Sequence, residues 1–180
     1  AAVTYADALP VLATHFPALG PYLTRIGSRQ VRALGTLGGN IGTASPIGDS
    51  APVLIALETR LTLVSVRGRR TLPLEDFFLG YRKTALAADE VIERLTLPRL
   101  WPGEVFHCDK LSKRRDQDIS TVAAGWRVRL KDGRFEDVRI GIGGMAATPK
   151  RAVAVEKALR EEGFAAAAAD RKSTRLNSSH

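Results

Sequence analysis

The segment from Gly35 to Asp49 carries the residue types and spacing best suited to chemistry in this sequence. Four of its first eight residues are glycine, and most of the others are small or bear a hydroxyl group. Glycine allows positive φ and lets backbone amides approach another group closely. Successive exposed amides beside short hydroxyl side chains form an anion site, most commonly for phosphate. Composition alone leaves two alternatives, a phosphate cradle or a flexible loop with a tight turn.

Other reaction chemistries find little support. The Walker A, GxGxxG and Gly-x-Ser-x-Gly patterns do not occur in the sequence. The histidines His15, His107 and His180 share no metal-ligand spacing. Cys108 is the single cysteine, so an internal disulfide or a cysteine-ligated iron–sulfur cluster within this chain is excluded. We expect it to be a small residue on a strand, and any enzymatic role requires a bound cofactor to supply the reactivity.

The glycine segment lies between two predicted helical regions. Thr4 is typical of the cap of a helix reaching about Thr14, and a second helix over 21–26 ends at Gly27. Arg29 and Arg32 then lead into the segment, either to neutralise phosphate or as a solvated helix end. After it, an acidic residue and a proline indicate the start of a buried helix over 49–57. The next predicted elements are strands at 59–66, from 71, and at 91–97, with a short helix at 74–78.

A linker over 98–103, with two prolines and a glycine, precedes a second predicted domain. Antiparallel strands are predicted at 104–111, 119–130 and 135–143, with Asp132-Gly133 as a hairpin turn. Thr148-Pro149 indicates a final helix reaching about Ala169. We therefore expect domains at 1–100 and 104–169. Residues 170–180 resemble the in-frame translation of a sequencing adapter, and we expect them to be foreign to the natural protein.

Composition limits the possible partners. The 180 residues carry a net charge of +8, but the basic residues are scattered and lack the interleaved aromatic residues of a nucleic-acid surface. We therefore expect no nucleic-acid partner, and the absence of an apolar run of about 20 residues predicts no membrane span. The single cysteine fits a reducing cytoplasm. The chain begins with neither Met nor a signal peptide, so we expect it to be a fragment.

Three ordered motifs over roughly residues 1–160 resemble one family. Residues 36–40 with 44–49 resemble the second FAD-binding loop of the xanthine dehydrogenase family of molybdenum hydroxylase flavoproteins. Residues 77–84 resemble the family segment that leads toward the flavin, which makes Tyr81 and Arg82 weaker site candidates. Residues 106–110, followed by residues 114–119, resemble the later K…RR.D.DI motif of the same family. Considered by itself, the segment Lys113–Asp118 would be a solvated loop, whereas the resemblance implies that it lies near the flavin.

The resemblance implies an α+β fold. Its first part would be the C-terminal half of a PCMH/vanillyl-alcohol-oxidase (VAO)-type FAD-binding domain. A small antiparallel-sheet-plus-helix domain like the C-terminal domain of CO dehydrogenase flavoproteins would follow. The implied cofactor is FAD, held by Ile26, Thr36, Gly38, Gly39, Asn40, Thr43, Ser45, Asp49, Ile92 and Lys110.

These assignments compete with simpler interpretations of the same residues. Asp49 would accept hydrogen bonds from FAD hydroxyl groups, cap the following helix, or do both. Ile26 would pack near the cofactor or belong to the ordinary core. Lys110 would place a cation near the flavin, or would be a solvated surface group.

The resemblance also implies partners. A molybdopterin-binding large subunit and a [2Fe–2S] domain, neither group bound by this chain, would deliver electrons taken from a purine, and NAD⁺ would accept them from FAD. Two alternatives remain, the flavoprotein of a CO, aldehyde or aromatic-acid hydroxylase and a non-enzymatic basic nucleotide- or nucleic-acid-binding module. The family's first glycine loop has no counterpart here, so we expect this chain alone to bind FAD poorly and to be inactive.

Overall fold

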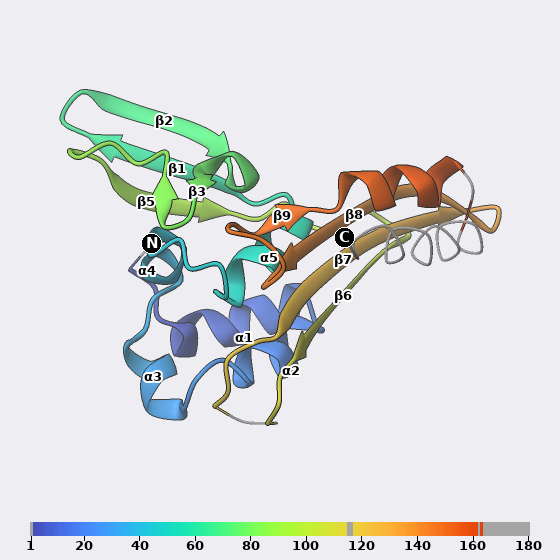
Figure 1. Ribbon diagram of the computed structural model, residues 1–180, viewed down its shortest axis with the longest axis horizontal. Coiled ribbons are helices and arrows are strands. Elements are labelled where there is room, and N and C mark those ends of the chain that lie inside the picture. The colour runs from blue at the N-terminus through green and yellow to red at the C-terminus, as the bar shows by residue number, and fades with distance from the viewer. Residues whose placement is uncertain (1, 115–116, 162, 164–180) are drawn as a thin grey trace, which may run out of the picture.

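The computed structural model describes residues 2–114, 117–161 and 163. Short helices gather at one end, a small sheet lies at another, and a longer sheet extends away from both (Figure 1). The helices are α1 Tyr5–His15, α2 Leu19–Thr24, α3 Arg29–Leu34, α4 Leu37–Gly42 and α5 Ser50–Ala56. The predicted α+β fold with antiparallel sheets is confirmed. None of the described helices is long and apolar enough to cross a membrane.

Hydroxyl caps begin three of these helices. Thr4 accepts from the Asp7 amide as predicted, Ser28 accepts from Val31, and Thr36 accepts from Gly39. The second helix begins at residue 19 rather than 21. The glycine segment, for which composition left a phosphate cradle or a flexible loop as alternatives, contains the six-residue helix α4, which begins after the Thr36 cap.

The first sheet has the order β2-β1-β5, formed by β1 Arg60–Ser65, β2 Gly68–Pro73 and β5 Val91–Thr96. Its second strand begins at residue 68 rather than 71, because Ser65 pairs with Gly68 across a two-residue turn. The 3₁₀ helix η1 Leu74–Phe77 and the hairpin of β3 Phe78–Gly80 with β4 Lys83–Thr84 follow.

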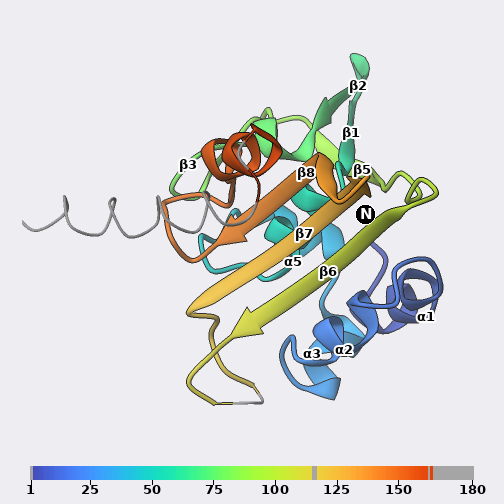
Figure 2. The same ribbon diagram turned by 90° about the vertical axis from the view of Figure 1, so that its right-hand side faces the viewer.

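The second sheet has the order β6-β7-β8-β9 (Figure 2). Its strands are β6 Glu104–Leu111, β7 Val122–Lys131, β8 Arg134–Gly143 and β9 Lys150–Arg151. The predicted hairpin is confirmed, since Asp132 and Gly133 both adopt positive φ, at 50° and 75°.

The prediction that Thr148-Pro149 starts the last helix is wrong. Lys150 and Arg151 pair with Ile142 and Gly141, so their backbones complete the sheet before the chain becomes helical over 153–161. The predicted end of that helix near Ala169 and the adapter-like residues 170–180 lie outside the described residues.

Helix α5 lies directly on the inner face of the second sheet, over β7 and β8. Glycine makes this approach possible, since a Cβ on Gly141 would overlap the Pro52 carbonyl oxygen. A Cβ on Gly125 would lie 2.9 Å from Val53 Cα. Both contacts would be closer than a real Cβ atom makes, so alanine at position 141 or 125 would force helix α5 away from the sheet.

One hydrophobic core runs through both parts of the chain. It contains the buried faces of α1, α2, α5 and β1, and it includes Phe106 and Cys108 of β6. Phe16 and Phe106 meet edge to face, with ring centroids 6.2 Å apart. Cys108 is buried on a strand, and its thiol donates to the Ala18 carbonyl. The linker over 98–103 therefore does not separate two cores, and the division into domains at 1–100 and 104–169 stays a prediction.

Candidate functional site

The first turn of α4 contains the glycine pair Gly38 and Gly39. The Leu37 amide donates to the Val3 carbonyl at 3.1 Å, and the Gly39 amide donates to Thr36 Oγ1 at 2.9 Å. Within the described part of the chain, the Gly38 amide has no hydrogen-bond acceptor. A Cβ on Gly39 would lie 2.8 Å from Thr36 Oγ1, so glycine is needed for the cap to close. The turn thus has one amide, on the buried residue Gly38, whose acceptor would have to come from outside the described chain.

Asn40 supplies an unsatisfied acceptor beside this turn. Its Oδ1 atom is buried and has no hydrogen-bond partner among the described residues. An ideal Cβ on Gly48 would lie 3.6 Å from that oxygen, which places it against the turn that leads into Asp49. Buried polar atoms in proteins are nearly always hydrogen-bonded. Asn40 Oδ1 and the Gly38 amide are therefore two groups of α4 without partners among the described residues, and a ligand that brings both a donor and an acceptor would satisfy them.

A buried ion pair lies at the other end of the same segment. Lys110 Nζ is 2.7 Å from Asp49 Oδ2, and the Lys110 side chain is 2% exposed. The second carboxylate oxygen, Asp49 Oδ1, accepts a hydrogen bond from Ser120 Oγ. Asp49 occupies the N-cap position of α5 as predicted, but its side chain makes no capping hydrogen bond. Lys110 is likewise no solvated surface group, since it projects from β6 into the interior.

Helices α1 and α2 hold this pair in place. Tyr22 donates to the Asp49 carbonyl at 2.8 Å, and the Tyr5 hydroxyl lies 2.5 Å from Ser50 Oγ. Burial and then the Asp49 charge raise the pKa of Tyr22 well above its ordinary value. Burial, opposed by the Ser50 hydrogen bond, raises the pKa of Tyr5 to about 12. Both phenols therefore remain protonated donors at neutral pH.

Arg25 and Lys110 also bond each other reciprocally. The Arg25 guanidinium donates to the Lys110 carbonyl at 2.6 Å, and Lys110 Nζ donates to the Arg25 carbonyl at 3.3 Å. Since Arg25 ends α2, this pair of contacts fixes the helix against β6. The lysine ammonium thus has a carboxylate and a helix-terminal carbonyl as acceptors.

The remaining predicted site residues are distributed around these two clusters. Thr43 ends α4 and donates to the Asn40 carbonyl at 2.7 Å, and the Ser45 carbonyl accepts from the Gly48 amide at 3.0 Å. Ile92 of β5 reaches the end of α4, where an ideal Cβ on Gly42 would lie 3.7 Å from its Cδ1. Ile26 is 8% exposed and belongs to the hydrophobic core, as its simpler interpretation expected.

Several weaker candidates are placed elsewhere or otherwise engaged. Tyr81 is 62% exposed at the β3–β4 turn, with the Arg82 guanidinium over its ring at 5.9 Å. Arg32 donates to the Thr24, Ile26 and Gly27 carbonyls, so it caps the end of α2 instead of pointing at an anion. Residues 115–116 of the predicted Lys113–Asp118 segment lie outside the described residues.

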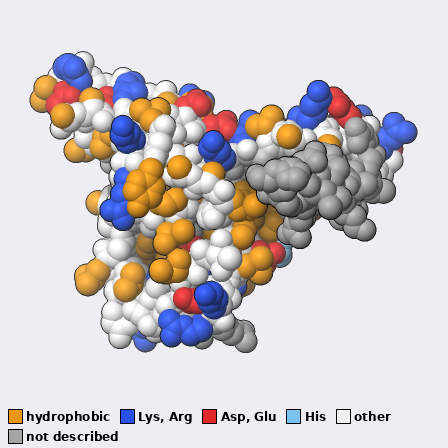
Figure 3. Space-filling model, in the orientation of Figure 1, with side chains coloured by type: hydrophobic (Ala, Val, Ile, Leu, Met, Phe, Trp, Pro, Cys, Tyr) orange, Lys and Arg blue, Asp and Glu red, His pale blue; other side chains and the backbone are white. Residues whose placement is uncertain are grey.

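An apolar surface surrounds the α4 turn. Figure 3 shows hydrophobic side chains gathered on the face that carries α3, α4 and the adjoining loops, with charged groups mainly at its margins. Leu34 is 83% exposed, Ile47 is 41% exposed, and Met145 is 70% exposed. The Gly144 amide donates to the Pro46 carbonyl at 3.0 Å, which places the last two of these segments beside each other. Exposed apolar area of this kind marks a surface for a ligand or another polypeptide.

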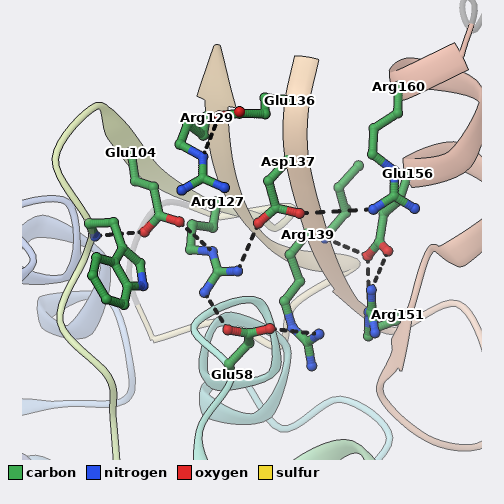
Figure 4. A network of polar contacts seen from close by, with 12 residues as sticks. Glu58, Glu104, Arg127, Arg129, Glu136, Asp137, Arg139, Arg151, Glu156 and Arg160 are labelled. Carbon is green, nitrogen blue, oxygen red and sulfur yellow. Dashed lines mark hydrogen bonds and ion pairs between the residues drawn. The ribbon is translucent and has the colours of Figure 1, made fainter. Parts of the chain in front are cut away.

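A second polar cluster, which no sequence motif indicated, lies at the C-terminal end of α5 (Figure 4). Glu58, at a positive φ of 55°, contacts Arg127 at 2.7 Å and Arg139 at 3.2 Å. Burial opposes ionisation of Glu58, but the Arg127 hydrogen bond and both arginine charges lower its pKa overall. Arg139 also contacts Glu75 at 2.9 Å. A cavity of about 430 Å³ beside this cluster is lined by Glu58, Arg60, Pro73, Glu75, Thr96, Pro98 and Arg139.

Two protein families match the sequence in succession. Residues 1–100 match the family described as the FAD binding domain in molybdopterin dehydrogenase. Residues 108–179 match the family described as the CO dehydrogenase flavoprotein C-terminal domain.

Similar curated proteins include xanthine dehydrogenases. The xanthine dehydrogenase/oxidase of Gallus gallus is 44% identical over 122 residues, which is 66% of this chain and 9% of that protein. The xanthine dehydrogenase of Blastobotrys adeninivorans is 40% identical over 139 residues, or 76% of this chain and 10% of that protein. The chain therefore spans about a tenth of the length of these relatives.

Solved structures share the fold. The carbon monoxide dehydrogenase from Hydrogenophaga pseudoflava aligns with a TM-score of 0.84 and 31% identity, covering 90% of this chain and 57% of that chain. Quinoline 2-oxidoreductase from Pseudomonas putida aligns with a TM-score of 0.79 and 26% identity, covering 90% of this chain and 56% of the other.

Proposed function

Because this chain belongs to the family of FAD binding domains in molybdopterin dehydrogenases, we propose that it is the FAD-holding, electron-transferring part of a xanthine dehydrogenase. In that role it passes electrons from [2Fe–2S] clusters through FAD to NAD⁺. The molybdopterin-binding large subunit and the [2Fe–2S] domain are its partners in the intact enzyme, which acts on a purine in the cytoplasm. The 44% identity to the xanthine dehydrogenase/oxidase of Gallus gallus over 122 residues supports this choice.

The observation that carries the proposal is the incomplete hydrogen bonding at the α4 turn. The Gly38 amide lacks an acceptor within the described chain, and Asn40 Oδ1 lacks a donor. A dinucleotide supplies both, through its phosphate oxygens and its ribose hydroxyl or ring N–H groups. Unpaired groups of this kind cost about 1–3 kcal/mol each when buried, and a ligand recovers that energy. The residues present therefore fit FAD.

FAD, when bound, supplies reversible uptake and release of two electrons, which no side chain of this chain can provide. The chain's own groups would bind and orient it. The Gly38 amide and the Thr36 hydroxyl would donate to the diphosphate, and Ile92 would exclude water beside them. Lys110, held by Asp49, would supply a positive charge within a low-dielectric interior, where its field is stronger than in water.

A titration of this chain with FAD, followed by flavin fluorescence, tests the proposal. We expect weak binding, because only one of the two implied glycine loops is matched. ADP should compete, since it shares the diphosphate, and riboflavin should not. Gly39→Ala should weaken binding about tenfold by opening the Thr36 cap, whereas Gly80→Ala, whose Cβ meets nothing closer than 3.9 Å, should leave it unchanged. Equal affinity in both variants would contradict the proposal.

A separate measurement addresses the electron acceptor. In the intact enzyme, with its other domains present, NADH should bleach the flavin absorption under anaerobic conditions. Absence of bleaching, with normal reduction by a purine, would contradict NAD⁺ as the electron acceptor and would indicate another acceptor.

A further inference from the structure

We propose that Ser120 is a positioning residue for Lys110, acting through the Asp49 carboxylate. Ser120 lies at the end of the connection between β6 and β7 and is 4% exposed. Its hydroxyl bonds one oxygen of Asp49, and the other oxygen bonds the Lys110 ammonium at 2.7 Å. Lys110 and Ser120 lie 61 and 71 residues after Asp49 in the sequence, respectively.

The Asp49 carboxylate needs two hydrogen-bond donors because it is buried and makes no capping hydrogen bond to helix α5. Asp49 is 8% exposed, and its side chain makes no hydrogen bond to the first turn of α5. Among the described residues, Lys110 and Ser120 are its side-chain partners. Without the serine hydroxyl, the carboxylate could rotate about its terminal torsion, which has a broad energy well. The hydroxyl therefore selects the orientation in which Oδ2 faces the ammonium.

The serine itself is held by rigid backbone. The neighbouring Thr121 amide donates to the Leu111 carbonyl at 2.8 Å, where β6 and β7 come together. The Thr121 carbonyl packs so closely on Gly144 that a Cβ there would lie 2.5 Å from it. These contacts of Thr121 anchor the backbone next to Ser120, which favours a fixed contact between the Ser120 hydroxyl and Asp49.

The contacts from Ser120 to Asp49 and from Asp49 to Lys110 fix the position of the lysine side chain. The ammonium has acceptors on Asp49 and on the Arg25 carbonyl, and both contribute to its burial. For the part played by Lys110 at the cofactor, this inference rests on the proposed function. The positioning itself concerns residues of this chain alone, so it can be measured without FAD.

The experiment observes the Lys110 ammonium protons by proton–nitrogen NMR in the FAD-free chain. Lys110 is the one buried lysine among the described residues, so its ammonium protons should exchange slowly enough to give a resonance, which Lys110→Arg should remove. In Ser120→Ala, we expect these protons to exchange about 10- to 100-fold faster, the ratio that loss of a hydrogen bond to a charged group produces. Ser120→Thr, which keeps the hydroxyl, should restore slow exchange.

Two references separate positioning from general destabilisation. Backbone amides of β1 report global opening, so Ser120→Ala should accelerate the ammonium protons much more than these amides. Ser65→Ala, which removes a partly exposed hydroxyl far from the pair, should change neither. Unchanged ammonium exchange in Ser120→Ala, or equal acceleration of the β1 amides, would overturn the proposal. If the ammonium protons behave as expected but the chain does not bind FAD, the proposed function is refuted and the positioning role of Ser120 stands.

Discussion

Replacing Gly141 by alanine perturbs the contact between helix α5 and the second sheet, which holds the two parts of the chain together. The new Cβ would overlap the Pro52 carbonyl oxygen and lie 2.9 Å from Pro52 C and 3.1 Å from the Ala56 amide nitrogen. All three atoms are backbone, so no side-chain rotation relieves the overlap. Helix α5 must shift away from the sheet, opening the packing along its whole length.

The expected cost is large. Overpacking a core usually costs about 1–3 kcal/mol, and a clash with backbone belongs at or above the upper end. Alanine recovers about 0.5–1 kcal/mol through the smaller entropy of the unfolded chain. We therefore expect a net loss of at least about 2 kcal/mol, which lowers Tm by roughly 4–8 °C in a chain of this size.

Chemical denaturation of a matched series measures this effect. Gly125→Ala, with its closest contact at 2.9 Å, should be destabilised less than Gly141→Ala. Gly80→Ala, with 3.9 Å to a flexible lysine side chain, should stay within about 0.5 kcal/mol of the parent. A Gly141→Ala protein as stable as the Gly80→Ala protein would refute the reasoning, because it would mean that α5 does not rest on the sheet.

Three further predictions concern single groups. Lys110→Met should lower the free energy of unfolding by about 3–5 kcal/mol by leaving Asp49 charged and unpaired, and adding Asp49→Asn should restore part of it in denaturation experiments. Burial raises the pKa of Cys108 from 9.0 to about 12, so the unfolded chain loses this proton first, and the contribution of Cys108 to stability should decline as pH rises from 9 toward 12. Cys108→Ala should show a smaller decline in this range, the remainder coming from Tyr5 and Tyr22, whose pKa values are also raised. Thr36→Ala should cost about 1 kcal/mol through loss of the α4 cap and should accelerate exchange of the Gly39 amide.

Local signals in the sequence predicted much of the secondary structure. Hydroxyl caps such as Thr4, the Asp132-Gly133 turn and the alternation along 104–111 act over a few residues, so they can be recognised without the fold. The failures also have local causes. A hydroxyl before two glycines can cap a short helix as well as open a loop, and the pairing of Lys150 with Ile142 depends on the chain folding back onto the preceding strand, β8.

The candidate site was only partly predictable for the same reason. Motif resemblance identified Asp49 and Lys110 as residues of interest, but nothing in the sequence indicated that they pair with each other across 61 positions. Ser120 carries no motif, and its role arises from the β6–β7 register. Glu58 likewise depends on a left-handed backbone conformation and on two arginines from β7 and β8.

Backbone amide NMR of the α4 turn during an FAD titration tests the central claim most directly. The account predicts that FAD and ADP both shift the amide resonances of Gly38, Gly39 and Asn40, whereas riboflavin, which lacks the diphosphate, leaves them in place. Resonances that stay fixed with FAD at saturating concentration, or that move equally with riboflavin, would contradict the assignment of this turn to the cofactor's phosphates.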